Sequence, residues 1–185
     1  MSRNAKPLLA LIAGVALSAL SITTVHAAPG VGSNEVQVAA GFFHAQGSDS
    51  GNFNADLSYG YYLTPGWEIG FRQALNYNFI DGARDFWVAT TTPFLLYNFK
   101  ISDIVVPYLG VQGGIVWNDQ KITGTFGPNA GLKLFLTGQT FLNIGYRYEW
   151  YFHSFRSAEN NRTRGNHIAN IGLGFVWGGQ TTTTR

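Results

Sequence analysis

Six charged residues lie on one face of short segments whose opposite face is apolar. Successive side chains of an extended strand point to opposite sides, so residues of the same parity share a face. A charge shielded from water is costly unless an opposite charge pairs with it. The set holds three acids and three bases, so every charge can have a partner: Asp56, Glu68, Arg72, Lys133, Arg147 and Glu149. The pattern predicts an ion-pair network on the polar face, and the alternative is a gated path for ions.

The sequence offers little for catalysis or metal binding. His153 and Ser154 are the only adjacent pair of a base and a hydroxyl nucleophile. Adjacent residues in a strand face opposite sides, and no third residue is placed by spacing to orient the histidine. Cysteine is absent, which excludes disulfides and thiol chemistry. We therefore predict no catalytic residue, no cofactor and no metal site.

Period-two alternation recurs along the chain and predicts the strands that position the charges. It is clearest at 52–63, where Leu57 and Tyr59 share one face and Asp56 and Ser58 the other. The segment near 86–99 is apolar on both faces, so its register is not predicted. Eight strands are expected, near 35–44, 52–63, 67–79, 86–99, 105–117, 129–137, 141–152 and 167–177.

The predicted connections alternate in length. Short turns fall at 64–66, 100–103 and 138–139. Longer polar loops fall at 46–51, 80–85, 118–124 and 153–165. Short turns on one side and longer loops on the other are typical of outer-membrane barrels, in which the short turns are periplasmic.

The first 27 residues have the pattern of a secretory signal peptide. Arg3 and Lys6 precede an apolar run over 8–20, and cleavage is expected after Ala27. The run is shorter than the ~20 residues that a membrane-spanning helix needs. Without this leader, ten basic residues stand against ten acidic ones, so the formal charge of +2 predicts no nucleic-acid partner. We expect residues 28–177 to form one barrel and 178–185 a disordered tail.

Alternation alone also fits a soluble barrel or sandwich with an apolar interior. Charged residues are 12% of the chain, well below the roughly 25% of soluble domains. The polar face is rich in glycine, which suits a crowded interior. Aromatic residues gather at both strand ends, as membrane interfaces require: Tyr61, Trp67, Tyr97, Phe141, Phe175 and Trp177 near the short turns, and Phe53, Tyr77, Phe79, Trp117, Trp150 and Phe152 near the long loops. We therefore predict an all-β, eight-stranded antiparallel transmembrane β-barrel of up-and-down topology.

Three segments resemble small outer-membrane barrels of the OmpA/OmpX type. They are Val106-Pro107-Tyr108-Leu109-Gly110-Val111, Gly145-Tyr146-Arg147-Tyr148-Glu149 and Ile171-Gly172-Leu173-Gly174-Phe175. The resemblance covers nearly all of the mature chain. It implies export through the periplasm, insertion by the barrel assembly machinery and residence among the lipid and lipopolysaccharide of a Gram-negative outer membrane. Family members often end at an aromatic residue, whereas eight residues follow Trp177 here.

On this fold, two groups of basic side chains fall near the outer rim. One crowds the last long loop, where Glu159 is the opposing acid, and could bind lipopolysaccharide phosphates or a host polyanion, or could simply be solvated. The other is a pair of outward-facing histidines on the first and last strands, which barrel closure makes neighbours. The residues are Arg156, Arg162, Arg164, His44 and His167.

The function that we predict is non-enzymatic. An eight-stranded barrel is barely wide enough for its own side chains, so we expect a side-chain-filled lumen and a structural or adhesive role in the cell envelope. The alternatives are a narrow channel for small solutes or ions and a lipid A-modifying enzyme. The sequence does not predict an oligomeric state.

Overall fold

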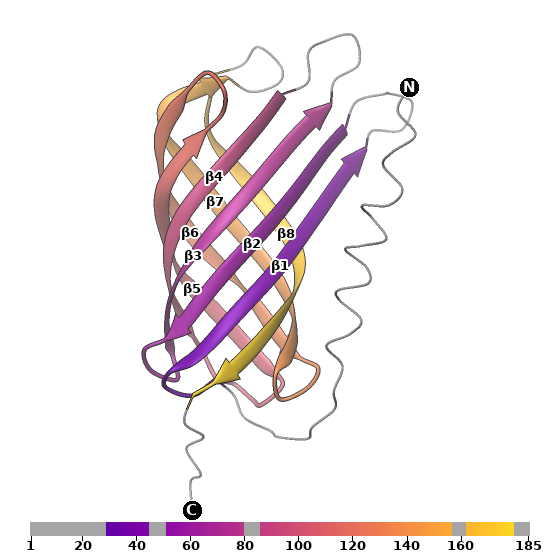
Figure 1. Ribbon diagram of the computed structural model, residues 1–185, viewed down its shortest axis with the longest axis vertical. Coiled ribbons are helices and arrows are strands. Elements are labelled where there is room, and N and C mark those ends of the chain that lie inside the picture. The colour runs from indigo at the N-terminus through magenta and orange to yellow at the C-terminus, as the bar shows by residue number, and fades with distance from the viewer. Residues whose placement is uncertain (1–28, 45–50, 80–85, 157–161, 180–185) are drawn as a thin grey trace, which may run out of the picture.

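The chain folds into a closed β-barrel (Figure 1). The structure is a computed structural model that describes residues 29–44, 51–79, 86–156 and 162–179, with the backbone alone at 42–44, 154–156 and 162–164. No helix in these ranges has the length and apolarity needed to cross a bilayer. The strands are β1 (Ser33–His44), β2 (Gly51–Tyr62), β3 (Trp67–Phe79), β4 (Phe86–Asn98), β5 (Val105–Trp117), β6 (Ile122–Phe135), β7 (Thr140–Arg156) and β8 (Arg162–Gly178).

Each strand pairs with its neighbours in sequence, and β1 pairs with β8 to close the sheet. All pairings are antiparallel, which confirms the predicted up-and-down topology. Gly178, expected in the tail, instead pairs with Ser33 as the last residue of β8. Residues 180–185 and the predicted leader lie outside the described part.

Two of the predicted loops were too long. β6 begins at Ile122, so the connection from β5 is Asn118–Lys121 rather than 118–124. Gly124, Gly127 and Pro128 make this stretch resemble a turn in sequence, yet its residues pair in register with β5. β7 and β8 likewise extend to Arg156 and from Arg162, into the predicted loop 153–165.

The short turns share one local solution, a hydroxyl side chain that accepts backbone N–H groups. Thr64 Oγ1 accepts from the amides of Gly66 and Trp67, and Thr137 Oγ1 accepts from those of Gln139 and Thr140. Ser102 Oγ does the same in the turn between β4 and β5. These turns lie together at the lower end of Figure 1.

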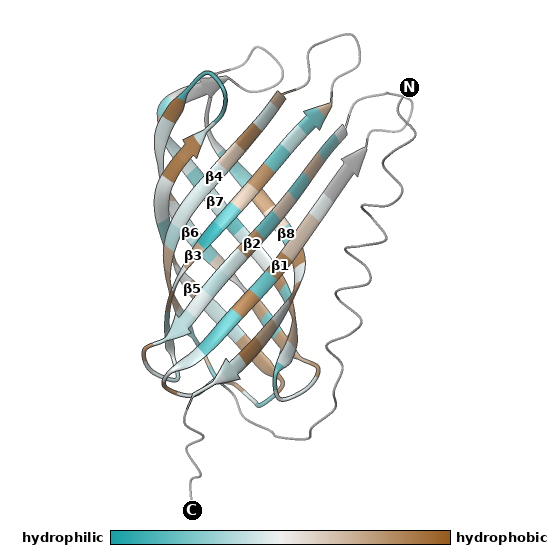
Figure 2. Ribbon diagram, viewed as in Figure 1, coloured by the Kyte–Doolittle hydropathy of each residue, from teal (hydrophilic) through white to brown (hydrophobic). Residues whose placement is uncertain are grey.

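The apolar face is the outer one. Figure 2 shows hydrophobic and hydrophilic positions alternating along the strands. Leu57 and Leu109 on the outer face are 54% and 55% exposed, whereas Glu68 on the inner face is 1% exposed. The barrel is therefore inside-out relative to a soluble one. The structure also gives the register of β4: the side chains of Phe94 and Leu96 point inward, and those of Leu95 and Tyr97 point outward.

Glycines on the inner face make room for the large interior side chains. A Cβ at Gly60 would meet the carboxylate of Glu68, and one at Gly174 would meet the ring of Phe141. The glycines of the polar face thus leave the space in the lumen that the long charged side chains occupy.

Candidate functional site: the charged interior

The part of the lumen near the short turns contains an ion-pair cluster centred on Lys133. Its Nζ donates to Glu35 Oε2 at 2.6 Å, to Glu68 Oε2 at 2.8 Å and to the Tyr62 hydroxyl at 2.9 Å. Tyr62 donates in turn to Glu35 Oε2, and Asn98 Nδ2 donates to Glu68 Oε2. We call these five residues the turn-side cluster. They come from β1, β2, β3, β4 and β6, so the cluster joins strands on facing sides of the barrel.

Aromatic rings surround the same ammonium group. Lys133 Nζ lies 5.3–5.6 Å from the ring centres of Tyr62, Tyr108 and Phe141. Cation–π attraction is strongest where the cation is desolvated, and Lys133 is 1% exposed. The lysine is therefore held by two carboxylates, one hydroxyl and three ring faces.

A second cluster lies farther from the short turns. Arg147 on β7 donates from Nη1 and Nη2 to the two oxygens of Asp56 on β2, both at 2.8 Å. This two-point pairing is the strongest geometry available to a guanidinium and a carboxylate. Arg147 Nε donates to Glu149 Oε1 at 3.2 Å, and Asn170 Nδ2 donates to Asp56 Oδ2 at 2.6 Å. We call Asp56, Arg147, Glu149 and Asn170 the central cluster.

Arg72 has a neutral partner instead of an acid. Its Nη1 donates to Gln112 Oε1 at 2.7 Å, and its guanidinium lies over the ring of Phe94. None of the ion pairs among the described residues includes Arg72. The sequence allowed the three acids and three bases to pair completely, and Arg72 is the member without an acid partner in the described part of the chain.

Arg147 pairs with two of the predicted acids and Lys133 with the third, so none remains for Arg72. The sequence reasoning also missed a fourth acid, Glu35. It is buried on the inner face of β1 and shares Lys133 with Glu68. The signal was present, because Val36 and Val38 fix the outer parity of that segment and so turn Glu35 and Gln37 inward. With Glu35, the described inner face carries four acids against three bases.

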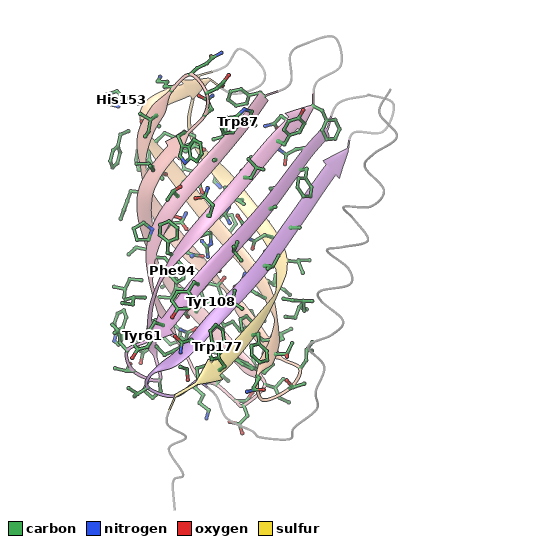
Figure 3. All side chains as sticks on the ribbon, in the orientation of Figure 1. Tyr61, Trp87, Phe94, Tyr108, His153 and Trp177 are labelled. Atoms are coloured by element: carbon green, nitrogen blue, oxygen red, sulfur yellow. The ribbon has the colours of Figure 1, made fainter. Side chains whose placement is uncertain are left out.

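Aromatic side chains mark both ends of the barrel. Figure 3 places Tyr61 and Trp177 near the short turns and Trp87 and His153 near the longer loops. At the turn end, Trp67 packs edge-on against Tyr97 at 5.0 Å, and at the loop end Trp87 packs edge-on against Trp117 at 5.6 Å. Two such girdles around an apolar outer face are the arrangement expected at two membrane interfaces.

A family model described as "Outer membrane protein beta-barrel domain" matches residues 8–177. The chain belongs to this family. Its location is therefore the outer membrane of a Gram-negative cell, as predicted. No curated protein matches the sequence.

Solved structures of outer-membrane barrels share the fold. The N-terminal β-barrel domain of Pseudomonas aeruginosa OprF is 20% identical, with a TM-score of 0.51, over 80% of this chain and 99% of that one. Neisserial surface protein A is 17% identical, with a TM-score of 0.55, over 78% and 94%. Yersinia pestis Ail, in complex with the heparin analogue sucrose octasulfate, is 16% identical, with a TM-score of 0.51, over 80% and 99%. At these identities the similarity establishes the fold alone.

The predicted histidine pair of this outer-membrane barrel is placed only in part. His167 is exposed on the outer face, where its Nδ1 lies 2.6 Å from the Tyr146 hydroxyl and its ring lies against Tyr148. The ladder between β1 and β8 ends at Ala40 and Ile171, so it does not itself bring His44 opposite His167. The side chain of His44 lies outside the described part.

The arginine group falls at the far end of the hairpin formed by β7 and β8. The backbones of Arg156 and Arg162 pair there, and Arg164 follows in β8. Their side chains, like that of Ser154, lie outside the described part, and so does Glu159. Within the described ranges, no group of three or more His, Asp or Glu residues could hold a metal ion.

Proposed function

We propose that this protein is a non-enzymatic outer-membrane barrel with a closed lumen, and that its role in the envelope is structural and adhesive. The observation that carries the closed lumen is the pairing of opposite charges across the barrel at two levels. Lys133 on β6 meets Glu35 on β1, and Arg147 on β7 meets Asp56 on β2. These contacts join strands that do not neighbour one another in the sheet.

Burial supports a plug over a pore. The side chains of Lys133, Glu68, Arg147 and Glu149 are each 1–2% exposed. A water-filled path beside them would leave these atoms accessible. Opening such a path would separate ion pairs in a low-dielectric interior, where an unpaired charge carries its full desolvation penalty.

One observation favours the narrow channel as a second candidate. Arg72 is buried in the middle of the barrel and has a neutral amide partner rather than a carboxylate. Because it is the least constrained interior cation, its side chain would be the first to move if ions passed. Swelling of protein-loaded liposomes in small sugars and salts tests this. Our proposal expects the swelling rate of empty liposomes, and rapid swelling would favour the channel.

The adhesive part of the proposal rests on the hairpin formed by β7 and β8. Both strands have 17 residues, longer than the other six, and their far end carries Arg156, Arg162 and Arg164. Guanidinium groups suit sulfate and phosphate oxygens, and Ail, which shares the fold, was solved with a sulfated sugar. We propose that these arginines bind anionic polysaccharide or lipopolysaccharide phosphate at the cell surface.

Binding of sucrose octasulfate at graded salt concentrations tests the adhesive role. The wild type should bind more weakly as salt rises, and replacing all three arginines by glutamine should abolish binding. The double variant Lys100→Gln and Lys121→Gln, in turns of the same barrel, serves as a control that removes two positive charges elsewhere. Equal binding by the arginine variant would contradict the assignment. Mass spectra of lipid A from cells with and without the protein test the enzymatic alternative, and we expect identical spectra.

We also propose that residues 1–27 are removed as a signal peptide and that the barrel assembly machinery inserts the mature chain. Mass measurement of the protein from outer membranes tests the first point, because cleavage after Ala27 fixes the mature mass.

A further inference from the structure

Three polar side chains form a hydrogen-bonded track on the lipid-facing side of β3, β4 and β5. Thr91 Oγ1 donates to Gln73 Oε1 at 2.7 Å, and Trp117 Nε1 donates to Thr91 Oγ1 at 3.1 Å. Exposed apolar side chains, among them Leu75 and Ile115, flank the three. We call Gln73, Thr91 and Trp117 the polar track.

The polar track runs from the aromatic girdle at the loop end of the barrel into the hydrocarbon region. Trp117 packs against Trp87 at the loop end of the barrel and pairs with Ala89 in the ladder. Its indole N–H points to Thr91, two residues from Ala89 toward the short turns. The track ends at Gln73, in the middle of β3 and opposite Leu57 of β2.

Gln73 retains hydrogen-bonding capacity toward the lipid. A carboxamide has two N–H donors and an oxygen with two lone pairs. Among the described residues, the one acceptor for Gln73 Nε2 is the backbone oxygen of Ala74, at 3.3 Å. A polar group in hydrocarbon is costly unless it has a partner, so a polar group of a bound lipid would be stabilised at this carboxamide.

An independent feature adds a backbone acceptor beside the track. The ladder between β4 and β5 lacks the pairs Thr92–Gly114 and Pro93–Gly113, yet it resumes in the same register at Phe94–Gln112. Phe99 N donates to Pro107 O, so β4 residues of this parity, including Pro93, direct their backbone nitrogen to β5. Proline has no N–H to donate, and the Gly113 carbonyl loses its ladder partner. Gly113 has the outward parity of β5 and no side chain of its own, and the ring of Phe126 lies beside it, 3.4 Å from where its Cβ would be.

We propose that this face, formed by the polar track and the Gly113 carbonyl, binds an outer-leaflet amphiphile whose acyl chain carries a hydroxyl or amide group. A plain acyl chain has no group for these donors and acceptors. A hydroxyl donates to Gly113 O or Gln73 Oε1 and accepts from Gln73 Nε2, while the alkyl part contacts the flanking leucine and isoleucine. The site lies on the outside of the barrel and is independent of whether the lumen conducts.

Two sources share this chemistry, the 3-hydroxyacyl chains of lipid A and hydroxylated phospholipids. Native mass spectrometry of the intact barrel tests both with matched lipid pairs. One arm uses lipid A and its counterpart without the 3-hydroxyl groups. The other uses phosphatidylethanolamine with and without one hydroxyl on an acyl chain. The members of each pair have the same headgroup, so a difference in retention reports the hydroxyl.

The wild type should retain the hydroxylated member about 3- to 10-fold better in at least one arm, as one net hydrogen bond supplies. Gln73→Leu and Thr91→Val should each lose the preference. Leu75→Val, on the same face of β3, changes no hydrogen bond and should keep it. A preference in the lipid A arm alone would identify lipid A as the ligand. A preference in both arms would mean that the site recognises the acyl-chain hydroxyl in either lipid. Equal retention by the wild type in both arms, or an undiminished preference in Gln73→Leu and Thr91→Val, would overturn the proposal. So would retention of a second copy of the chain in place of lipid.

Discussion

Replacing Lys133 by methionine should destabilise the inserted barrel more than any exchange of a surface charge. Methionine keeps much of the volume and removes the ammonium group that Glu35 and Glu68 share. Both carboxylates are buried, at 3% and 1% exposure, and would face each other without a cation. Removing one partner of a buried ion pair costs about 3–5 kcal/mol, and two stranded carboxylates place this variant at the upper end of that range.

Urea unfolding in lipid vesicles, followed by tryptophan fluorescence, measures the loss. The matched control is Lys100→Met, because Lys100 pairs with Asp103 at 3.1 Å in an exposed turn. An exposed pair contributes less than about 1 kcal/mol. The reasoning is refuted if Lys133→Met lowers the unfolding free energy no more than Lys100→Met does.

A compensated variant separates charge from packing. In Lys133→Met with Glu35→Gln and Glu68→Gln, no charge remains in the turn-side cluster. Most of the stability should return if the loss came from stranded carboxylates. Failure to recover would mean that the lysine acts mainly through its packing against the surrounding rings.

The remaining predictions concern the lipid face, the topology and the central cluster. Three variants place an arginine on the outer face in mid-strand: Leu57→Arg, Leu109→Arg and Ile144→Arg. Each should lower the free energy of unfolding in lipid by roughly 2–4 kcal/mol, measured by a folding titration. Tolerance of all three would mean that this face does not contact lipid. Cysteines at Ser50 and Asn160, both outside the described residues, should react with an impermeant reagent on intact cells, and labelling only after the outer membrane is broken would invert the topology. Arg147→Ala should lower stability by about 3–5 kcal/mol, because it strands Asp56 and Glu149.

Strand number, topology and face assignment followed from the sequence because a barrel repeats one rule along every strand. Alternation assigns each residue to lipid or lumen, so Leu57 and Asp56 were separated correctly without any long-range information. The rule failed where both faces are apolar. In β4, Phe94 and Leu95 look equivalent in sequence, and only the pairing with β3 and β5 decides that Phe94 lies beneath Arg72.

The pairing of the interior charges was less predictable. Parity turns Arg72 and Lys133 inward, but which acid each meets depends on strand tilt and on distances across the lumen. Lys133 takes two acids from β1 and β3, and Arg72 is left with an amide from β5. The polar track was hidden for a related reason, because Gln73, Thr91 and Trp117 are far apart in sequence and adjacent only through the ladder.

Single-channel recording in planar bilayers tests the closed lumen most directly. The wild-type barrel should give no steady current. Arg147→Ala should lose stability without becoming a gated pore, because the turn-side cluster still closes the lumen on the short-turn side of residue 147. A steady, large single-channel current from the wild type would contradict the closed lumen. A variant that conducts more while its stability hardly changes would identify the charges as a gate.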